Sequence, residues 1–119
     1  MPRRLKRRLY ARVRRKPKKK GEPNGLELRH KAEVIGTDAN LILIGYECLT
    51  VRLADNTSYT ADFVVQHKDD GEIELHEVKG GVWLGDSRVK FKMAAELYPQ
   101  FHWKSYLYSG KVLKKVEDL

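Results

Sequence analysis

Hydrophobic residues recur with two different periods along this chain, and each period is typical of one kind of element. Segments rich in Ile, Leu and Val, or alternating between apolar and polar residues, predict strands. Apolar residues spaced three and four positions apart predict helices. Turn-forming residues such as Gly36, Gly71 and Pro99 separate the segments. We predict, in chain order, a helix at 25–36, strands at 41–53, 58–65 and 72–79, a helix at 86–98 and a strand at 101–108.

The order of these elements predicts an α/β fold built on one mixed sheet. The short turn at 68–71 makes the second and third strands an antiparallel hairpin, and the helix at 86–98 carries the chain to a fourth strand. The result is an αβββαβ core in which helices flank the sheet. We also expect a break in the first strand at Gly45 and a short tail after the turn at Ser109-Gly110. The apolar stripe of the second helix would comprise Val89, Met93, Ala94 and Leu97.

The charge is distributed very unevenly, which changes the picture of a simple globular domain. The 119 residues include 24 Lys and Arg and 16 Asp and Glu, so the formal net charge is +8. Residues 1–20 hold 12 of the basic residues and no acidic one, which leaves 12 basic and 16 acidic residues in the other 99. Like charges at this density favour a flexible segment. The chain therefore divides into a basic arm, residues 1–22, and one mildly acidic folded domain, residues 23–119.

The basic arm predicts a polyanionic partner. Nucleic acid is the most common one, because each phosphate that is neutralised releases a counterion. An anionic membrane, an acidic protein, a localisation signal and a solubilising tail are the alternatives. Leu5, Leu9 and Val13 recur at helical spacing, so the arm could form a helix on a polyanion. The arm residues predicted to contact nucleic acid are Arg3, Arg4, Lys6, Arg7, Arg8, Arg12, Arg14, Arg15, Lys16, Lys18, Lys19 and Lys20.

Cysteine content and hydropathy exclude several classes of protein. Cys48 is the single cysteine, so neither an intramolecular disulfide nor a cysteine-rich zinc module can form. No apolar run near the N-terminus has the length of a signal-peptide core, and no run reaches the ~18–20 residues of a membrane-spanning helix. We therefore expect a cytoplasmic protein that is neither secreted nor embedded in a membrane.

The clearest chemical implication comes from three charged residues on the second and third predicted strands. Glu77 and Lys79 are two residues apart, so they share the otherwise apolar face of Leu75. Asp62 lies within an apolar strand, where a buried carboxylate is unfavourable unless it is paired or binds a cation. The hairpin makes the two strands neighbours, so Asp62 and Glu77 would lie side by side and a divalent cation would relieve their repulsion. Hard oxygen ligands suit Mg²⁺ or Mn²⁺, and Lys79 would stabilise a developing phosphate charge.

Asp62 followed, after a hairpin, by Glu77-Val78-Lys79 resembles the D…ExK signature of the PD-(D/E)xK nuclease superfamily, with Ala61 in place of the usual proline. The predicted order of elements also matches the core of that superfamily over roughly residues 24–108. The resemblance is closest to the phage-encoded and archaeal Holliday-junction resolvases. The segments that carry it are Asn-Gly-Leu-Glu (24–27), Arg-Leu-Ala-Asp-Asn-Thr-Ser-Tyr-Thr-Ala-Asp-Phe (52–63), His-Glu-Val-Lys-Gly (76–80) and Arg-Val-Lys-Phe-Lys-Met-Ala-Ala-Glu (88–96).

The resemblance implies a small restriction-endonuclease-like fold and an endonuclease that depends on Mg²⁺, with Mn²⁺ as a substitute, and cuts branched DNA such as four-way junctions. Asp62 and Glu77 would be metal ligands, the Val78 carbonyl a third ligand, and Lys79 the catalytic lysine. Glu27 matches the catalytic glutamate on the first helix of the superfamily. A homodimer is implied as well, because a junction is nearly two-fold symmetric and needs two cuts.

Plainer interpretations stand beside these assignments. Asn24 and Glu27 have the spacing of a helix capping box, so Glu27 would only cap the helix, and Glu33 would be the alternative catalytic position. Asp62 would be a surface residue on a half-exposed strand. Glu77 and Lys79 would be ordinary surface charge, which contributes ~0–1 kcal/mol to stability.

Further candidates lie near the start of the second predicted helix and among the histidines. Arg88 and Lys90 would bind phosphates, or form a solvated helix face. Trp83 would stack on a base, or pack onto its own domain. The histidines show no metal-ligand spacing: His30, His67, His76 and His102. His76 points away from Glu77, so we assign it a structural or surface role.

Other functions compete with a junction nuclease, among them a ribosome-associated or RNA-binding protein, which only the basic arm suggests. Another is a nicking, restriction-like or single-strand nuclease of the same fold. A third is a nucleic-acid-binding module without catalysis. A pure binder has no use for acidic side chains near phosphates, since they repel the ligand. The combination of Asp62, Glu77 and Lys79 therefore favours a nuclease.

Overall fold

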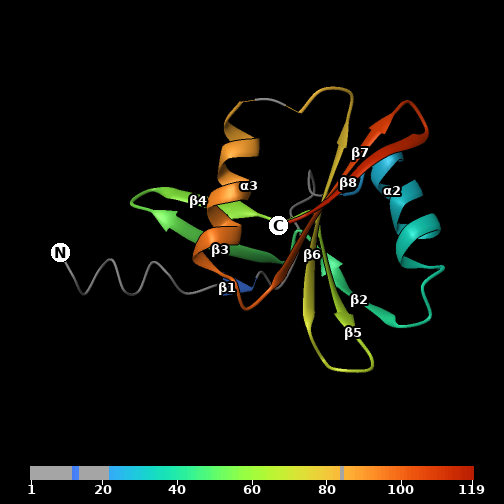
Figure 1. Ribbon diagram of the computed structural model, residues 1–119, viewed down its shortest axis with the longest axis horizontal. Helices are drawn as coiled ribbons and strands as arrows, with labels where there is room; N and C mark the ends of the chain where they lie inside the picture. Colours follow the sequence, from blue (N-terminus) through green and yellow to red (C-terminus); the bar gives the residue numbers. More distant parts are fainter. Residues whose placement is uncertain (1–11, 14–21, 84) are drawn as a thin grey trace.

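A five-stranded sheet with one helix on each side forms the centre of the molecule (Figure 1). The computed structural model describes residues 12–13, 22–83 and 85–119. The helical segments are α2 (Gly25–His30), its π-helical continuation η2 (Lys31–Ile35) and α3 (Asp86–Leu97). The strands are β1 (Arg12–Val13), β2 (Leu41–Tyr46), β3 (Leu49–Ala54), β4 (Thr57–Thr60), β5 (Phe63–His67), β6 (Ile73–Gly80), β7 (His102–Ser109) and β8 (Val112–Asp118).

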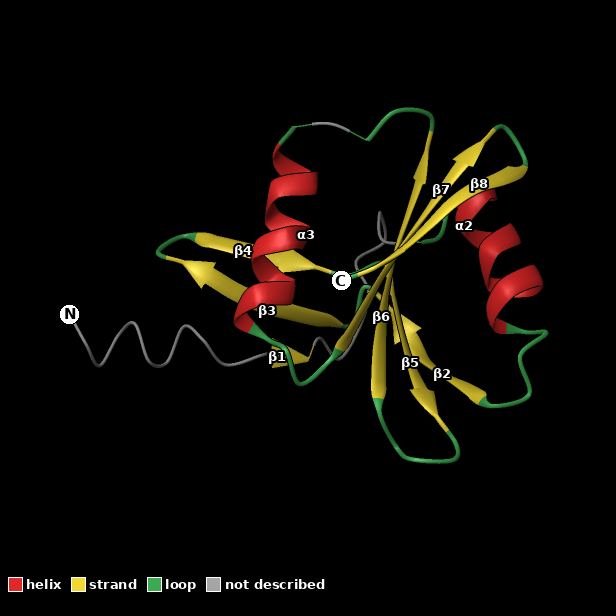
Figure 2. Cartoon of the chain, in the orientation of Figure 1, coloured by secondary structure: helices red, strands yellow, loops and turns green. Residues whose placement is uncertain are grey.

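The strands belong to two sheets. The larger sheet has the order β2-β5-β6-β7-β8, and only the β6–β7 pair in it is parallel, joined through α3. Strands β1, β3 and β4 form a separate sheet, which lies beside α3 (Figure 2). The predicted α/β class with a mixed sheet is confirmed, but the expectation of one sheet is wrong.

Both faces of the five-stranded sheet are covered, which produces two hydrophobic clusters. On the α3 side, Leu75, Phe91 and Trp103 are at most 1% exposed and pack with residues of β3 and β4. On the α2 side, Phe63 and Val65 are fully buried and pack with residues of η2 and β7. The alternation in β6 therefore separates two buried faces, and not a core face from solvent.

The strand predicted at 41–53 is two strands, β2 and β3, one in each sheet. They are separated by Glu47 and Cys48, and Glu47 has the left-handed φ of 47° that lets the chain turn sharply. Gly45 is not the break; it lies in a bulge of β2. A Cβ atom at Gly45 would lie 2.9 Å from the Cys48 sulfur, so a larger residue here would displace the Cys48 side chain.

The strand predicted at 58–65 is also two strands, β4 and β5. Ala61 and Asp62 form the link by which the chain passes from one sheet to the other. The expectation that Asp62 lies within a strand is therefore wrong. The β5–β6 pairing begins at Phe63 and His76, one residue beyond Asp62.

The C-terminal part of the chain differs from the prediction too. The residues after the turn at Ser109-Gly110, expected to be a tail, form the edge strand β8, antiparallel to β7. Almost all β8 side chains are exposed, so its sequence lacks the alternation by which a half-buried strand is recognised.

The buried face of α3 is only partly as predicted. Ala94 is buried, but Val89, Met93 and Leu97 are 56%, 37% and 41% exposed. The core position belongs to Phe91, whose large ring contacts Trp83 and Trp103. The helix thus turns its aromatic side chain inward and leaves the aliphatic stripe at the surface.

The described residues include little of the basic arm. The backbones of Arg12 and Val13 pair with Thr50 and Leu49, so Val13 lies in a strand and not in a helix. The other arm residues predicted to contact nucleic acid lie outside the described residues: Arg3, Arg4, Lys6, Arg7, Arg8, Arg14, Arg15, Lys16, Lys18, Lys19 and Lys20.

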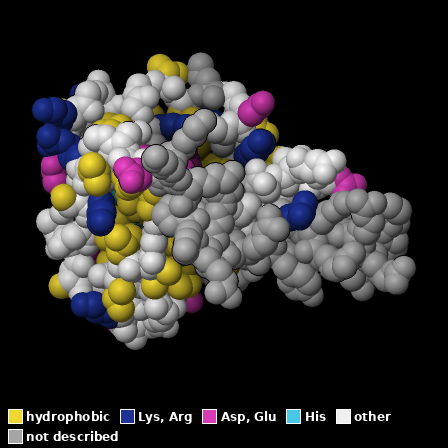
Figure 3. Space-filling model, turned by 180° about the vertical axis from the view of Figure 1, so that it is seen from behind, with side chains coloured by type: hydrophobic (Ala, Val, Ile, Leu, Met, Phe, Trp, Pro, Cys, Tyr) yellow, Lys and Arg dark blue, Asp and Glu magenta, His cyan; other side chains and the backbone are white. Residues whose placement is uncertain are grey.

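Two observations concern the surface. Large hydrophobic side chains are exposed on the edge strand β2, at Ile42 and Ile44, and the view from behind shows hydrophobic side chains gathered on part of that face, with Lys and Arg at the margin (Figure 3). None of the described helices has the length and apolar character that crossing a bilayer requires.

Candidate active site

The C-terminal half of β6 carries the two charged residues of the ExK signature. Glu77 is 4% exposed, and the Lys79 Nζ atom lies 3.7 Å from Glu77 Oε2. Both side chains point to the α3 side of the sheet, because Leu75, two and four residues earlier, belongs to the cluster on that side. A buried carboxylate and a partly exposed ammonium group therefore meet near the end of this strand.

Asp62 reaches the same place from the link between the two sheets. Its Oδ2 atom accepts a hydrogen bond of 2.7 Å from the backbone N–H of Val78. The N–H and C=O of one strand residue point to the same edge, so the Val78 carbonyl also faces the side of β6 on which Asp62 lies. Asp62 Oδ1 accepts no hydrogen bond from the described residues. An uncommitted carboxylate oxygen and a carbonyl oxygen thus lie on one side of β6.

Tyr59 in β4 holds the Glu77 carboxylate. Its hydroxyl donates a hydrogen bond to Glu77 Oε1. The ring is buried against Phe91 and Trp103, so the hydroxyl group is fixed in direction. Sequence reasoning missed this contact, because a tyrosine in an apolar strand looks like an ordinary core residue.

Glu27 is a helix cap and also a neighbour of the other carboxylates. Its backbone N–H donates to Asn24 Oδ1 at 2.8 Å, and its Oε1 atom accepts from the Asn24 N–H at 2.9 Å, so the predicted capping box is present. The Tyr46 hydroxyl donates to the same Oε1 atom at 2.9 Å. Glu27 is 8% exposed, whereas Glu33, the alternative, is exposed and pairs with Arg29 at 2.7 Å.

The carboxylates repel one another, and their pKa values reflect this. Burial, and next the charge of Glu77, raise the pKa of Asp62 to about 8, although the hydrogen bond from the Val78 N–H opposes the shift. Burial also raises the pKa of Glu77, against the hydrogen bond from Tyr59 and the charge of Lys79. The charge of Glu27 contributes to both increases. Such a concentration of destabilised carboxylates is typical of functional sites.

These residues fit a hard divalent cation by their chemistry. Asp62, Glu77 and the Val78 carbonyl offer oxygen ligands only, which Mg²⁺ and Mn²⁺ prefer. The carboxylates of Glu27, Asp62 and Glu77 do not all lie within 4.8 Å of one another, the spacing of ligand atoms around one bound metal ion. In the described part of the chain, the group with ligand atoms within 4.8 Å of one another is His67, Asp69 and Asp70.

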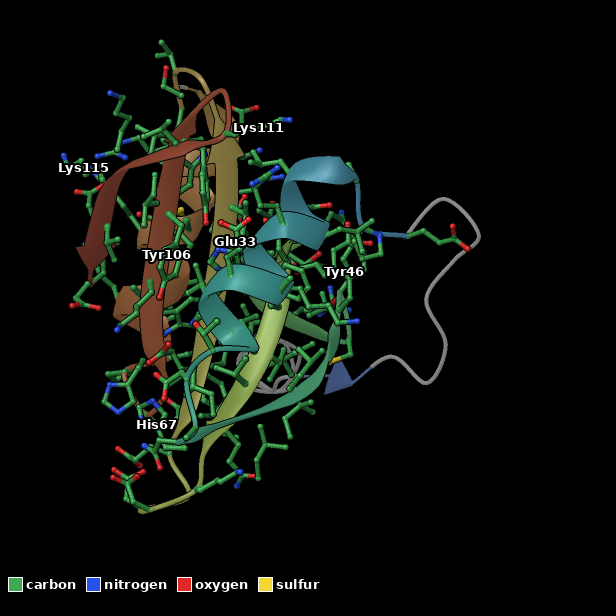
Figure 4. The ribbon with its side chains drawn as sticks, turned by 90° about the vertical axis from the view of Figure 1, so that its right-hand side faces the viewer. Glu33, Tyr46, His67, Tyr106, Lys111 and Lys115 are labelled. Carbon is green, nitrogen blue, oxygen red and sulfur yellow. The ribbon has the colours of Figure 1, made fainter. Side chains whose placement is uncertain are left out.

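That group lies on the β5–β6 hairpin. His67 is at the opposite end of the sheet from Lys111 and the β7–β8 turn (Figure 4). Its ring already bonds Glu74 through Nε2, at 2.9 Å, and both aspartates are exposed. We assign it no role in the candidate site.

The predicted phosphate-binding residues of α3 have different surroundings. Arg88 donates a hydrogen bond to Glu117 Oε1 at 3.3 Å, and its guanidinium carbon lies 5.3 Å from the centre of the Trp83 ring. Trp83 packs onto its own domain, since it is 7% exposed and contacts Phe91. Lys90 is partly exposed, two residues further along the helix.

A chain of buried hydrogen bonds crosses the α2 side of the sheet. The Tyr108 hydroxyl bonds His30 Nδ1 at 2.8 Å, and His30 Nε2 bonds His76 Nδ1 at 2.9 Å. The other His76 nitrogen bonds Glu74, whose second oxygen bonds His67. His30 and His76 are fully buried. His76 is therefore structural, which is one of the two roles predicted for it, but its direct contact with His30 gave no signal in the sequence.

Comparison with known proteins adds no relative. No protein-family model matches the chain, and neither a curated protein nor a solved structure does.

Proposed function

We propose that this protein is a metal-dependent DNA endonuclease of the restriction-endonuclease-like type, which hydrolyses phosphodiester bonds in branched DNA. The observation that carries the proposal is the meeting of Asp62 and Glu77, two carboxylates with raised pKa values, beside Lys79 at one end of β6. Each carboxylate accepts one hydrogen bond, Asp62 from the Val78 N–H and Glu77 from the Tyr59 hydroxyl, but Lys79 alone does not balance the charge of two buried acids.

In this proposal the residues divide the work. Asp62, Glu77 and the Val78 carbonyl hold the cation, which when bound lowers the pKa of a water molecule and polarises the phosphate. Lys79, whose ammonium group is partly exposed, binds the phosphate oxygen on which negative charge develops. Tyr59 keeps Glu77 oriented, and Glu27, whose charge acts on both Asp62 and Glu77, would orient a water molecule.

The substrate class follows from size and charge. The folded part is about 99 residues long, and the 12 basic residues of positions 1–20 supply affinity for any phosphate backbone. A domain of this size has little surface for reading bases, so we infer recognition of branch shape. Two symmetric cuts at a four-way junction would then require a homodimer.

A cleavage assay tests the function directly. In Mg²⁺, the protein is expected to make paired nicks in a synthetic four-way junction, and to make none in EDTA. Glu77→Gln should reduce the rate on the order of 100-fold, because it removes a charged ligand. Glu33→Gln is the matched control, since Glu33 is exposed, and should cut at the wild-type rate.

The substrates decide between the alternatives. Equal cutting of junction, linear duplex and single strand would leave a nuclease without branch specificity. Tight binding without cutting, in Mg²⁺ and in Mn²⁺, would remove the catalytic proposal.

Tyr59 is expected to act as a positioning residue for metal binding. Tyr59→Phe removes the donor to Glu77, and the pKa of Glu77 should rise further because that hydrogen bond lowers it. Metal ligands must be deprotonated, so the affinity for Mn²⁺ should fall about 10–100-fold near neutral pH and partly recover at higher pH. Calorimetric titration with Mn²⁺ measures this effect.

The control is Tyr108→Phe, which removes a buried hydroxyl that bonds His30 on the other face of the sheet. An equal loss of Mn²⁺ affinity in both variants would mean that Tyr59 contributes only to stability.

A further inference from the structure

The α3 face of the sheet continues the candidate site beyond β6, across two more strands. In the register of β6, β7 and β8, Lys79 is paired with Leu107, and Leu107 with Lys115. Neighbouring strands lie ~4.8 Å apart, so the backbone of Lys115 is ~10 Å from that of Lys79 on the same face. The row next to it begins at Glu77 and ends at Glu117.

A cavity of about 360 Å³ lies over these rows, under the loop that follows Lys79. Its floor and wall are apolar, from Leu107, Val82 and Trp83, with Ser105 beside them. Val82 is 79% exposed. The residues that line it are Gly81, Val82, Trp83, Arg88, Ser105, Leu107, Lys115 and Glu117.

Two basic side chains at the rim of the cavity, Arg88 and Lys115, pair with one carboxylate, that of Glu117. Glu117 accepts from Arg88 Nη1 at 3.3 Å through Oε1, and its Oε2 lies 3.7 Å from Lys115 Nζ. The Arg88 guanidinium carbon lies 5.3 Å from the centre of the Trp83 ring, a cation–π contact that holds the group beside the cavity. With Lys79 next to it, the region has an excess of positive charge even when Glu117 is ionised. Arg88 and Lys115 come from different elements, yet they point to the same carboxylate, which shows that one anionic group can contact both.

We propose that this cavity is a second phosphate subsite, which binds a phosphodiester of the same DNA strand a few nucleotides from the one that is cut. The inference rests on the proposed function and extends it. The rise along the duplex axis is ~3.4 Å per nucleotide, so two phosphates ~10 Å apart, the separation of the Lys79 and Lys115 backbones, are at most about three nucleotides apart in one strand. The phosphate displaces the Glu117 carboxylate from Arg88 and Lys115, and the sugar lies on the apolar floor. The Glu117 carboxylate therefore competes with the phosphate for Arg88 and Lys115, and this competition weakens DNA binding.

The test measures DNA binding without cleavage. Fluorescence anisotropy of a labelled short duplex in EDTA gives the dissociation constant at several salt concentrations. Lys115→Ala should weaken binding several-fold and reduce the slope of log affinity against log salt by about 0.9, which is the loss of one phosphate contact. Glu117→Gln should tighten binding, an effect opposite to the one expected if the ion pair were only structural.

Lys111→Ala is the matched control. Lys111 lies in the β7–β8 turn, outside the cavity, and both lysines are exposed (Figure 4). The two variants lose the same charge, so a general electrostatic effect would change both slopes equally. Equal slopes for Lys115→Ala and Lys111→Ala, or weaker binding by Glu117→Gln, would overturn the subsite and leave the nuclease proposal standing. A slope difference in a protein that does not cleave would remove the nuclease, and would support phosphate binding in the cavity without relation to a cut phosphodiester.

Discussion

Asp62→Asn is expected to make the metal-free protein more stable at pH 8 and above, although it removes a charged residue from the candidate site. The folded-state pKa of Asp62 is about 8, raised from 3.8 by burial and by the charge of Glu77. Between pH 3.8 and about 8, Asp62 in the folded protein therefore keeps a proton that it has lost in the unfolded chain. The amide of asparagine keeps an oxygen to accept the hydrogen bond from the Val78 N–H and carries no charge.

The sign of the pH dependence follows from the raised pKa. Below pH 3.8 both states are protonated and Asp62 has no effect. As pH rises from about 4 to about 8, the folded state loses stability, because the unfolded state gives up its proton first. Each pH unit corresponds to about 1.4 kcal/mol, so the full effect is roughly 2–4 kcal/mol after allowance for the partial exposure of Asp62.

Urea unfolding in EDTA at pH 5 and pH 8.5 measures the difference. The advantage of Asp62→Asn over the wild type should grow between these values. Asp118→Asn is the matched control, since Asp118 is 72% exposed and pairs only loosely with Lys104, and its effect should be within ~0.5 kcal/mol at both pH values. An Asp62→Asn protein that is less stable than the wild type at pH 8.5 would mean that the carboxylate is satisfied, and would weaken the case for a metal site.

The strand segments could be predicted, but not their division between sheets. Ile, Leu and Val correctly indicated extended structure in 41–53 and 58–65 except at the links 47–48 and 61–62. The turn at Glu47 is made by a non-glycine residue with positive φ, which composition does not indicate. Ala61 and Asp62 interrupt the second segment without a proline or a glycine. Both breaks depend on tertiary contacts, for example the hydrogen bond of 2.8 Å from the Glu47 N–H to the Asp62 carbonyl.

The proximity of the site residues could be predicted, whereas their supporting contacts could not. The hairpin correctly implied that Asp62 lies near Glu77, although the two are connected through the Val78 N–H and not as paired strand neighbours. The capping-box spacing of Glu27 was informative by itself. The contact of Tyr59 with Glu77 joins residues of two different sheets, so no local pattern in the sequence could indicate it.

The burial of the second face of β6 could not be predicted from the sequence. Glu74 and His76 alternate with Ile73 and Leu75, and a polar face on a strand usually means solvent. Here α2 covers that face, and the two side chains are satisfied by hydrogen bonds to each other and to His30 and His67. A group of polar side chains can be buried only when each one has a hydrogen-bond partner. The partner of His76 on α2 is His30, which is 46 residues away in the sequence.

The buried histidine His30 produces the second large effect on the pH dependence of stability, and its sign is opposite to that of Asp62. Burial, and next the charge of His76, lower the pKa of His30 from 6.5 to about 3. Between these values the unfolded state binds a proton that the folded state does not, so stability falls as pH decreases from 6.5 to about 3. From pH 6.5 to pH 4.5 the loss is about 2–3 kcal/mol.

His30→Gln is expected to remove that dependence while lowering stability at neutral pH, because glutamine keeps hydrogen-bonding groups but fills less of the space against Phe63 and Tyr106. In the wild type, His30 and Asp62 oppose each other between about pH 4 and pH 6.5, so stability should change little there and fall above pH 6.5. In His30→Gln the opposing term is absent, and stability should increase steadily as pH falls from 6.5 to 4.5. In Asp62→Asn it should decrease over the same range. Urea unfolding of the three proteins at pH 4.5, 5.5 and 6.5 gives the slope of the unfolding free energy against pH for each. Parallel slopes for the wild type and His30→Gln would mean that His30 is protonated in the folded state. The buried hydrogen-bonded side chains would then carry a charge that Glu74 must balance.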